Sequence, residues 1–426
     1  MQKLVLSVLS MLVFFLGTAQ EEDFYFSDYT YATNIKSVKF HVDGLFLSLP
    51  VIDLNSGSQL ALSFDDLDGG IKDYTYRIIH CDRDWSPSGL TEMEYLDGFT
   101  EERIENFQFS FKTIFDYTHY ELKLPNRNIS WTKSGNYLLL VFEEDYDELP
   151  VITRRFMVVE PMVKIIPDVV RPSQVGKMRT HQEIDFAVDH ERLEIRVPRQ
   201  EITATIIQNG HWGHAVRNIP PLFTRVNRMI FDYQDKVVFP AMKEFRYLDM
   251  RSLRFRSENI SVIENYRDGT EVILFKDEKR AGKSYYSRED INGQFVIENI
   301  DQGNFDPDIA SDYAYVLFSL YSPQPFEGRD VYLYGGFTDW KLYDDFKMVY
   351  NNSINGYVAK VPLKQGYYDY VYVTTPEGDP RLPPNFEDTE GNNQETENEY
   401  SIFIYYRPFG ARYDRLIGAV TFNSGF

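Results

Sequence analysis

Cysteine and histidine, which often act as nucleophiles, bases or metal ligands, are scarce in this 426-residue chain. There is one cysteine, Cys81, and there are seven histidines. His211 and His214 flank Trp212 in a stretch that predicts a turn, but two imidazoles without a third ligand nearby are a weak metal signal. Cys81 ends a strand-like run, which favours a buried structural thiol over a nucleophile. The sequence therefore predicts no metal site and no catalytic cysteine.

The motifs that would bind nucleotides or calcium are incomplete. Gly282-Lys283-Ser284 resembles the end of a phosphate-binding loop, but Asp277 stands where that loop needs its first glycine. Asp82-Arg83-Asp84 begins like a calcium loop, yet Pro87 occupies the position of the invariant glycine. The sequence contains neither a Gly-x-Ser-x-Gly elbow nor a His-Glu-x-x-His helix. We therefore expect a protein that is not an enzyme and that needs no cofactor.

The charge balance narrows the possible partners. Asp and Glu outnumber Lys and Arg by 65 to 44, which gives a formal net charge of -21. Such a surface repels the phosphates of nucleic acids and anionic lipid headgroups, so we expect neither nucleic-acid binding nor electrostatic docking on a membrane. The hydrophobic fraction of 43% is enough for packed cores and excludes intrinsic disorder.

Residues 1–19 have the composition of a secretory signal peptide. Lys3 supplies a positive charge, and the apolar run from Leu4 to Leu16 is too short to span a bilayer core of ~30 Å. Gly17-Thr18-Ala19 then offers small residues before a cleavage site at Gln20. The alternative is a buried N-terminal strand. The signal peptide predicts an exported, periplasmic protein, and no later apolar run is long enough for membrane insertion.

Apolar residues alternate with polar ones in short runs through the rest of the chain. Alternation with a period of two, broken by Gly, Pro, Asn and Asp, indicates strands, so the chain is predicted to be all-β. Short strands at intervals of ~8–12 residues favour β-sandwiches. Examples of the alternation are Leu60, Leu62 and Phe64; Phe107, Phe109 and Phe111; Ile184, Phe186 and Val188; and Ile202, Ala204 and Ile206.

Local breaks divide the mature chain into three units. Pro161, Pro167 and Pro172 fall within a short span that predicts a first linker. A second break lies at Gly303–Asp308, just before a long apolar run. We therefore expect tandem sandwiches at residues 20–160, 161–305 and 306–426.

A pattern in the third unit resembles the early-set, immunoglobulin-like glycogen-binding modules. It consists of Val331–Trp340 (VYLYGGFTDW) and Gly366–Val373 (GYYDYVYV). In that family the tryptophan that matches Trp340 stacks on glucose, because a flat indole complements the apolar face of a pyranose. A second stacking tryptophan is expected after the tyrosine-rich strand, where this chain has Thr374–Gly378. The resemblance implies an early-set fold and leaves two roles for Trp340, glycan stacking or packing of its loop.

Motifs spread over almost the whole chain resemble the plug protein family of the type IX secretion system of gliding and pathogenic Gram-negative bacteria. The resemblance implies a periplasmic β-sandwich protein that binds the periplasmic mouth of the outer-membrane translocon barrel and blocks it when no cargo passes. The alternative is a glycan-binding accessory protein of the cell envelope that uses its third unit. The motifs are Tyr76–Trp85, Glu94–Phe99, Thr118–Tyr120, Leu124–Asn126, Ser134–Tyr137, Thr153–Phe156, Glu399–Tyr400, Tyr405–Arg407 and Arg412–Leu416.

Candidate contacts with a translocon partner lie in the middle unit. Pro220-Pro221 makes this stretch too rich in turns for the middle of a sheet. Aromatic and arginine side chains carry most of the binding energy at protein interfaces. We therefore expect contacts from nearby residues of these types, unless they pack the ends of the sandwich. The candidates are Trp212, His214, Phe223 and Arg225.

Overall fold

The computed structural model describes residues 24–144, 149–191, 193–379, 381 and 383–425. Strands account for nearly all of the regular structure, which confirms the all-β prediction. The α-helices of the described residues are single turns: α1 (Glu92–Tyr95), α2 (Pro198–Glu201) and α3 (Pro307–Ala310). None of the helices in these ranges has the length and apolarity needed to cross a bilayer. The predicted signal peptide, residues 1–19, lies outside the described residues.

The first unit is a β-sandwich whose core lies between two sheets. Leu60, Leu62 and Phe64 point into that core, as their alternation predicts. One sheet has the order β1 (Tyr29–Thr30), β12 (Ile152–Val159), β11 (Gly135–Glu143), β5 (Tyr74–Cys81) and β7 (Glu101–Arg103), with β3 (Val51–Asp53) parallel to β12. The other has the order β2 (Ile35–Val42), β4 (Leu60–Asp66), β9 (Thr118–Leu124) and β8 (Asn106–Phe109), and β10 (Ile129–Trp131) pairs separately with β6 (Leu96–Gly98).

The second unit is also a two-sheet sandwich. Ile184, Phe186 and Val188 of one sheet share a core with Ile402 and Ile404 of the other. The first sheet has the order β13 (Lys164–Val170), β14 (His181–Asp189), β18 (Arg228–Phe231) and β17 (Phe223–Arg225), with β19 (Val238–Pro240) paired to β14. The second has the order β16 (His211–Ile219), β15 (Ile202–Gln208), β30 (Glu399–Tyr406) and β31 (Arg415–Asn423).

The third unit is one ten-stranded sheet that curls around its own core. Leu248 near one end of the sheet and Ile260 at the other belong to the same buried cluster. The order is β20 (Arg246–Asp249), β29 (Gly366–Pro376), β26 (Arg329–Tyr334), β27 (Lys347–Asn351), β28 (Gly356–Lys364), β25 (Tyr313–Tyr321), β22 (Gly269–Leu274) and β21 (Ile260–Tyr266). β23 (Asp277–Glu278) pairs with β25, and β24 (Phe295–Ile297) pairs with β29.

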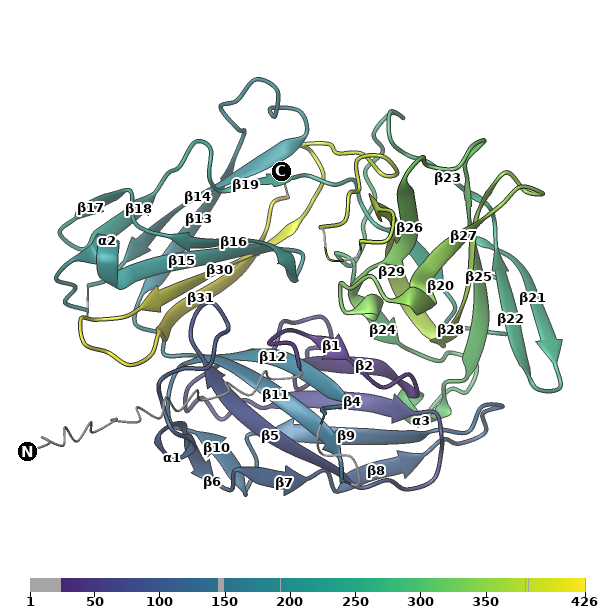
Figure 1. Cartoon of the computed structure of the whole chain (residues 1–426), viewed down its shortest axis with the longest axis horizontal. Coiled ribbons are helices and arrows are strands. Elements are labelled where there is room, and N and C mark those ends of the chain that lie inside the picture. The colour runs from purple at the N-terminus through teal and green to yellow at the C-terminus, as the bar shows by residue number, and fades with distance from the viewer. Residues whose placement is uncertain (1–23, 145–148, 192, 380, 382, 426) are drawn as a thin grey trace, which may run out of the picture.

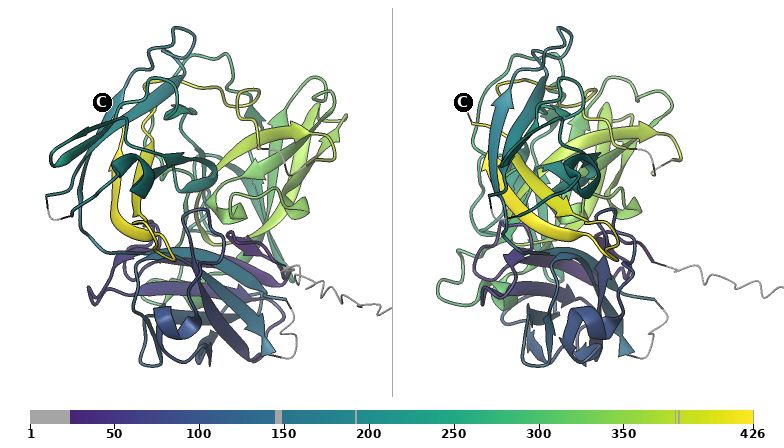
Figure 2. Two further views of the ribbon diagram at one scale, coloured as in Figure 1. Left: turned by 60° about the vertical axis from the view of Figure 1, so that its left-hand side comes forward. Right: turned by 90° about the vertical axis from the view of Figure 1, so that its left-hand side faces the viewer.

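The strand pairing divides the chain differently from the expected tandem units 161–305 and 306–426. β30 and β31 complete the second sandwich by pairing with β15, whereas β20 already belongs to the third unit through its pairing with β29. The third unit is therefore inserted into the second, and the last strands return to the second unit, as Figures 1 and 2 show in yellow beside teal. Alternation specifies which face of a strand is buried but not which strand is its neighbour.

The second and third units both pack on the first (Figure 1). β11 of the first unit is buried on both faces: Leu139 faces its own core, and Leu138 and Leu140 face the second unit. The cluster around Leu138 and Leu140 also contains Phe403 and Leu416 from the last two strands. The first two sandwiches therefore share a hydrophobic core.

Candidate functional site

The loop from Gly335 to Phe346 lies where the three units meet. It links β26 to β27 through the 3-10 turns η2 (Gly336–Thr338) and η3 (Asp344–Phe346). Asp339 and Trp340 have φ values of 53° and 55°, in the left-handed region that few non-glycine residues adopt. Two consecutive left-handed residues make a sharp corner. Asp339 contacts the first unit, and Trp340 packs on the second.

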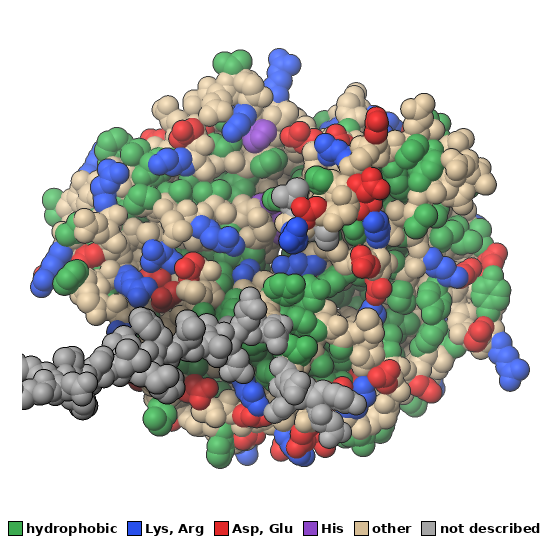
Figure 3. All heavy atoms as spheres, viewed as in Figure 1, with side chains coloured by type: hydrophobic (Ala, Val, Ile, Leu, Met, Phe, Trp, Pro, Cys, Tyr) green, Lys and Arg blue, Asp and Glu red, His purple; other side chains and the backbone are tan. Residues whose placement is uncertain are grey.

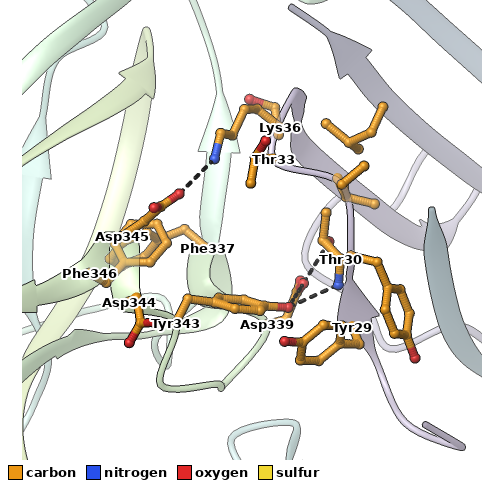
Figure 4. A pocket seen from close by; sticks show the side chains of 15 residues that line it. Tyr29, Thr30, Thr33, Lys36, Phe337, Asp339, Tyr343, Asp344, Asp345 and Phe346 are labelled. Atoms are coloured by element: carbon orange, nitrogen blue, oxygen red, sulfur yellow. Dashed lines mark hydrogen bonds and ion pairs between the residues drawn. The ribbon is translucent and has the colours of Figure 1, made fainter. Parts of the chain in front are cut away.

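Asp339 accepts hydrogen bonds that join the first and third units. Its Oδ1 is 2.8 Å from Arg154 Nη2, and its Oδ2 is 2.8 Å from Thr30 Oγ1. The Tyr343 hydroxyl donates to Oδ2 at 3.0 Å and accepts from the backbone N–H of Thr30 at 2.9 Å (Figure 4). Arg154 is 4% exposed, so this ion pair is shielded from water. The Thr153–Phe156 motif carries Arg154, but nothing in the sequence pointed to Asp339 as its partner.

Two of the cavities that border this loop share Tyr29, Tyr343 and Asp344. The smaller one, of about 270 Å³, lies between residues 29–38 and the loop, and Lys36 pairs with Asp345 across it at 3.3 Å (Figure 4). The larger one, of about 550 Å³, reaches His214 of the second unit. Aromatic rings with hydroxyl groups at their edges suit recognition of a ligand better than catalysis.

Trp340 packs against aromatic rings from two units. The ring of His211 lies 5.1 Å from it and tilted by 30°, and the rings of Tyr334 and Phe245 approach at 5.5 and 5.9 Å. Gly293 has φ +79°, and a Cβ there would lie 2.4 Å from the indole, so only glycine fits. In the structure Trp340 thus fills the joint between the second and third units, and glycan stacking at this residue stays a prediction.

His211 is the second unit's contribution to this joint. Its Nε2 lies 2.8 Å from the Tyr334 hydroxyl, and burial lowers the pKa of His211 well below its usual value. Burial also lowers the pKa of His214, to about 4. Both imidazoles are therefore neutral at pH 7. The described residues contain no group of three His, Cys, Asp or Glu side chains that could hold a metal ion.

A tryptophan pair joins the first and second units. Trp85 and Trp212 meet edge to face at 5.1 Å, and the other neighbour of Trp212 is Phe403, stacked at 5.6 Å. The guanidinium of Arg155 lies 4.5 Å from the Trp85 ring and 5.4 Å from the Trp212 ring. Burial lowers the pKa of Arg155 to about 10, which still leaves it charged. Trp212 is 8% exposed and belongs to the shared core.

Motifs from the two ends of the sequence meet at the rim of this joint. Arg83 donates to Asp414 at 2.8 Å, and Arg407 donates to Asp82 at 2.9 Å. The backbone N–H of Asp414 donates to Asp82 at 3.0 Å. The segments Tyr76–Trp85 and Arg412–Leu416, which carry the family resemblance, therefore form one interface. Their separation by more than three hundred residues hid this contact from sequence reasoning.

The structure separates the four predicted partner contacts. Trp212 is buried in the joint, and half-buried His214 lines the larger cavity. Phe223, 60% exposed, and Arg225 lie on β17, the edge strand at the far left of Figure 1. Trp212 and His214 do not lie at Pro220-Pro221 as expected, because they are near the start of β16, whose last residue, Ile219, precedes that turn. Only Phe223 and Arg225 have the exposure that a contact surface requires.

The first and third units share a second joint around Asp65. This carboxylate is fully buried and accepts from His119 at 2.7 Å, from the Tyr313 hydroxyl at 2.7 Å and from Lys364 at 2.6 Å. Burial would raise the pKa of Asp65, but Lys364 and His119 hold it below its usual value. The Tyr313 hydroxyl also bonds Ser37 at 2.7 Å. The buried charge is therefore matched by donors from both units.

Among the described residues, two pairs of reactive side chains lack the properties that catalysis needs. Ser88 Oγ lies 2.8 Å from His80 Nδ1, but burial lowers the pKa of His80 to about 4, which makes it a weak base. Cys81 is fully buried on β5, whereas His119 is on β9 in the opposite sheet. Cys81 and His119 therefore do not form the pair that a thiol nucleophile needs.

Asp369 should make stability depend on pH. Its Oδ2 accepts from the backbone N–H groups of Ile291 and Gly293, beneath Trp340. Burial, and then Asp290, raise the pKa of Asp369 to about 7. A carboxyl group whose pKa is higher in the folded protein than in the unfolded one stabilises the folded state at low pH. That stabilisation is lost as the pH rises through the folded-state pKa of about 7. We therefore expect the free energy of unfolding of the wild-type protein to fall between pH 5 and pH 8. In the Asp369→Asn variant this fall should be smaller by about 2–3 kcal/mol.

Chemical denaturation at the two pH values measures this difference. The exposed Asp97→Asn is the matched control, because it removes one carboxylate without removing a buried one. An Asp369→Asn variant with the same pH dependence as the control would show that Asp369 titrates normally.

Comparisons with known proteins were made for the sequence and for the structure. Residues 35–160 match the family model described as Type 9 secretion system plug protein 1st domain. A crystal structure of a hypothetical protein from Parabacteroides merdae aligns with a TM-score of 0.89 and 33% sequence identity, covering 94% of this chain and 99% of that chain. No curated protein matches the chain. The alignment spans all three units, so the nested arrangement is shared with that protein.

Proposed function

Because this chain belongs to the type IX secretion system plug protein family, we propose that it is a non-enzymatic periplasmic plug. It binds the periplasmic opening of the outer-membrane translocon barrel and occludes that opening while no cargo passes. The observation that carries the proposal is the family match over the first unit, on which the other two units sit. Export by a signal peptide at residues 1–19 belongs to the same proposal.

The joints between the units support an occluding role. A protein that covers a wide opening has to keep its domains in fixed positions. Arg154 with Asp339, and Lys364 with Asp65, are buried ion pairs between the first and third units. If the units separated, these charges and the polar groups around them would lose their partners. The arrangement of the first and third units in which both ion pairs are formed is therefore favoured over other relative positions of the two units.

The contact surface that we propose is the edge of the second unit around β17. Phe223 and Arg225 are exposed there, and they are of the residue types that dominate interface energies. The face shown in Figure 3 carries acidic and basic side chains interspersed rather than one large charged area. Apolar and hydrogen-bonded contacts at an edge therefore suit this protein better than long-range electrostatic attraction.

The test is co-purification with the translocon barrel from solubilised outer membranes. The wild-type protein should recover the barrel, and the double variant Phe223→Ala, Arg225→Ala should recover at least about tenfold less. The control is Phe255→Ala, which removes a phenyl ring from the third unit that is even more exposed than Phe223 (76% against 60%). Cells without the protein should remain viable but become permeable to small solutes.

Two results would count against this proposal. A wild-type protein that recovers no barrel would refute the partner. A double variant that recovers as much barrel as Phe255→Ala would leave the partner in place and move the contact surface away from β17.

A further inference from the structure

A groove of about 390 Å³ separates the first unit from the last two strands of the second. Val42, Leu45 and Leu49 line it on the first unit, and Phe403 and Ala419 line it on the second. We call this cavity the β31 groove. It is distinct from the two cavities at the loop Gly335–Phe346, and the plug proposal does not use it.

The edge of β31 forms one wall of the β31 groove. Ala419, Val420 and Thr421 line it together with Glu399 and Phe403 of β30, so the groove lies over the face of these two strands and reaches the edge of β31. β31 is the last strand of its sheet. Residues 160 and 162 bond Leu416 and Ile417, but within the described ranges no strand pairs with the outer edge beyond them. Gly418 is buried beside Val163 and Ile165, and the outer edge of residues 419–423 is open to another strand.

The opposite wall includes Leu45, which belongs to an exposed apolar turn. Leu45, Phe46 and Leu47 are 59%, 58% and 43% exposed. Hydrogen bonds fix the turn: Leu45 N–H donates to the Val42 carbonyl at 2.8 Å, and Ser48 N–H and Oγ both donate to the Leu45 carbonyl at 2.9 Å. Apolar side chains held out in water by an ordered backbone indicate an interaction surface.

The charges of the β31 groove select the kind of partner. Asp53 and Glu399 are the ionisable residues among those that line it, and no lysine or arginine does. Neither carboxylate forms an ion pair with a described residue. We propose that the β31 groove binds an extended segment of a partner protein, which adds as a strand to β31, inserts alternate apolar side chains and places a lysine or arginine at each carboxylate. This is strand addition at a sheet edge, with pockets that give specificity.

The experiment uses the full mature chain and a labelled peptide of alternating valine and threonine with a lysine at each end. Fluorescence polarisation should detect binding, and hydrogen exchange should show slower exchange in residues 415–423. A peptide with glutamate at each end should bind at least about tenfold more weakly. A peptide with proline at its centre should also bind at least about tenfold more weakly, because proline has no N–H group to donate to the hydrogen bonds between paired strands.

Variants of the groove give a second readout. Leu45→Lys and Asp53→Lys should each weaken binding of the lysine peptide at least about tenfold. Val226→Lys is the matched control, since Val226 is 92% exposed in the second unit and should leave binding unchanged. Asp53 is exposed, so its variant keeps the test valid even if Leu45→Lys perturbs the turn. Absence of binding, or binding without protection of residues 415–423, or equal binding by Asp53→Lys and the control would overturn the proposal.

Discussion

Replacing Lys364 by methionine should lower the free energy of unfolding by about 3–5 kcal/mol, because it leaves the buried carboxylate of Asp65 without its cation. Lys364 is 1% exposed and Asp65 is 0% exposed, so water does not replace the lost partner. His119 and Tyr313 still donate hydrogen bonds to the carboxylate, which keeps two of its three side-chain donors. Chemical denaturation at pH 7 measures the loss.

The control is the double variant Asp65→Asn, Lys364→Met. An asparagine can accept from the Tyr313 hydroxyl and donate toward His119, so no buried charge is left over. We expect the double variant to recover more than half of the stability that the single variant loses. A double variant as unstable as the single one would show that the packing of the lysine stem, and not the charge, is what matters.

Replacing Trp212 by alanine should destabilise the protein by about 3–5 kcal/mol. The side chain is 8% exposed and contacts Trp85, Phe403 and Arg155, so its removal opens a cavity in the core shared by the first two units. Phe223→Ala, at 60% exposure, should change stability by no more than about 0.5 kcal/mol. Thermal and chemical unfolding of the two variants provide the comparison.

This pair of variants also separates structure from binding. A Trp212→Ala variant that keeps its stability but loses the barrel would make Trp212 a contact residue, as the sequence suggested. The structure leads us to expect the reverse, with weaker binding only as a consequence of a loosened joint.

The sequence predicted strands well, but alternation did not always mark the buried face, since Phe109 and Phe111 are 54% and 42% exposed. Leu60, Leu62 and Phe64 face a core as expected. It did not predict the nesting of the third unit, since Ile402 and Ile404 alternate in the same way whichever sheet they join. The role of Trp340 was foreseen only as one of two options, because the distinction depends on His211 and Phe245, which are distant in sequence.

Interface positions were the least predictable part. Trp212 is aromatic and close to prolines, which suggested exposure, but its environment is decided by Trp85 in another unit. The motifs at Tyr76–Trp85 and Arg412–Leu416 were visible, yet the ion pair between Arg83 and Asp414 depends on a fold that brings these two segments together.

The nesting of the third unit has a consequence for how the chain acquires its structure. β15 pairs with β30, so residues 202–208 can form their strand pairing only after residues 400–406, about two hundred positions later, are available. Closing so long a loop costs conformational entropy, and contacts of such high sequence separation slow folding. Until the C-terminal strands arrive, β15 presents an unpaired edge of apolar residues to the surroundings. A chain that still lacks its C-terminal strands is therefore prone to aggregation, and a chaperone that covers the edge of β15 should aid its assembly.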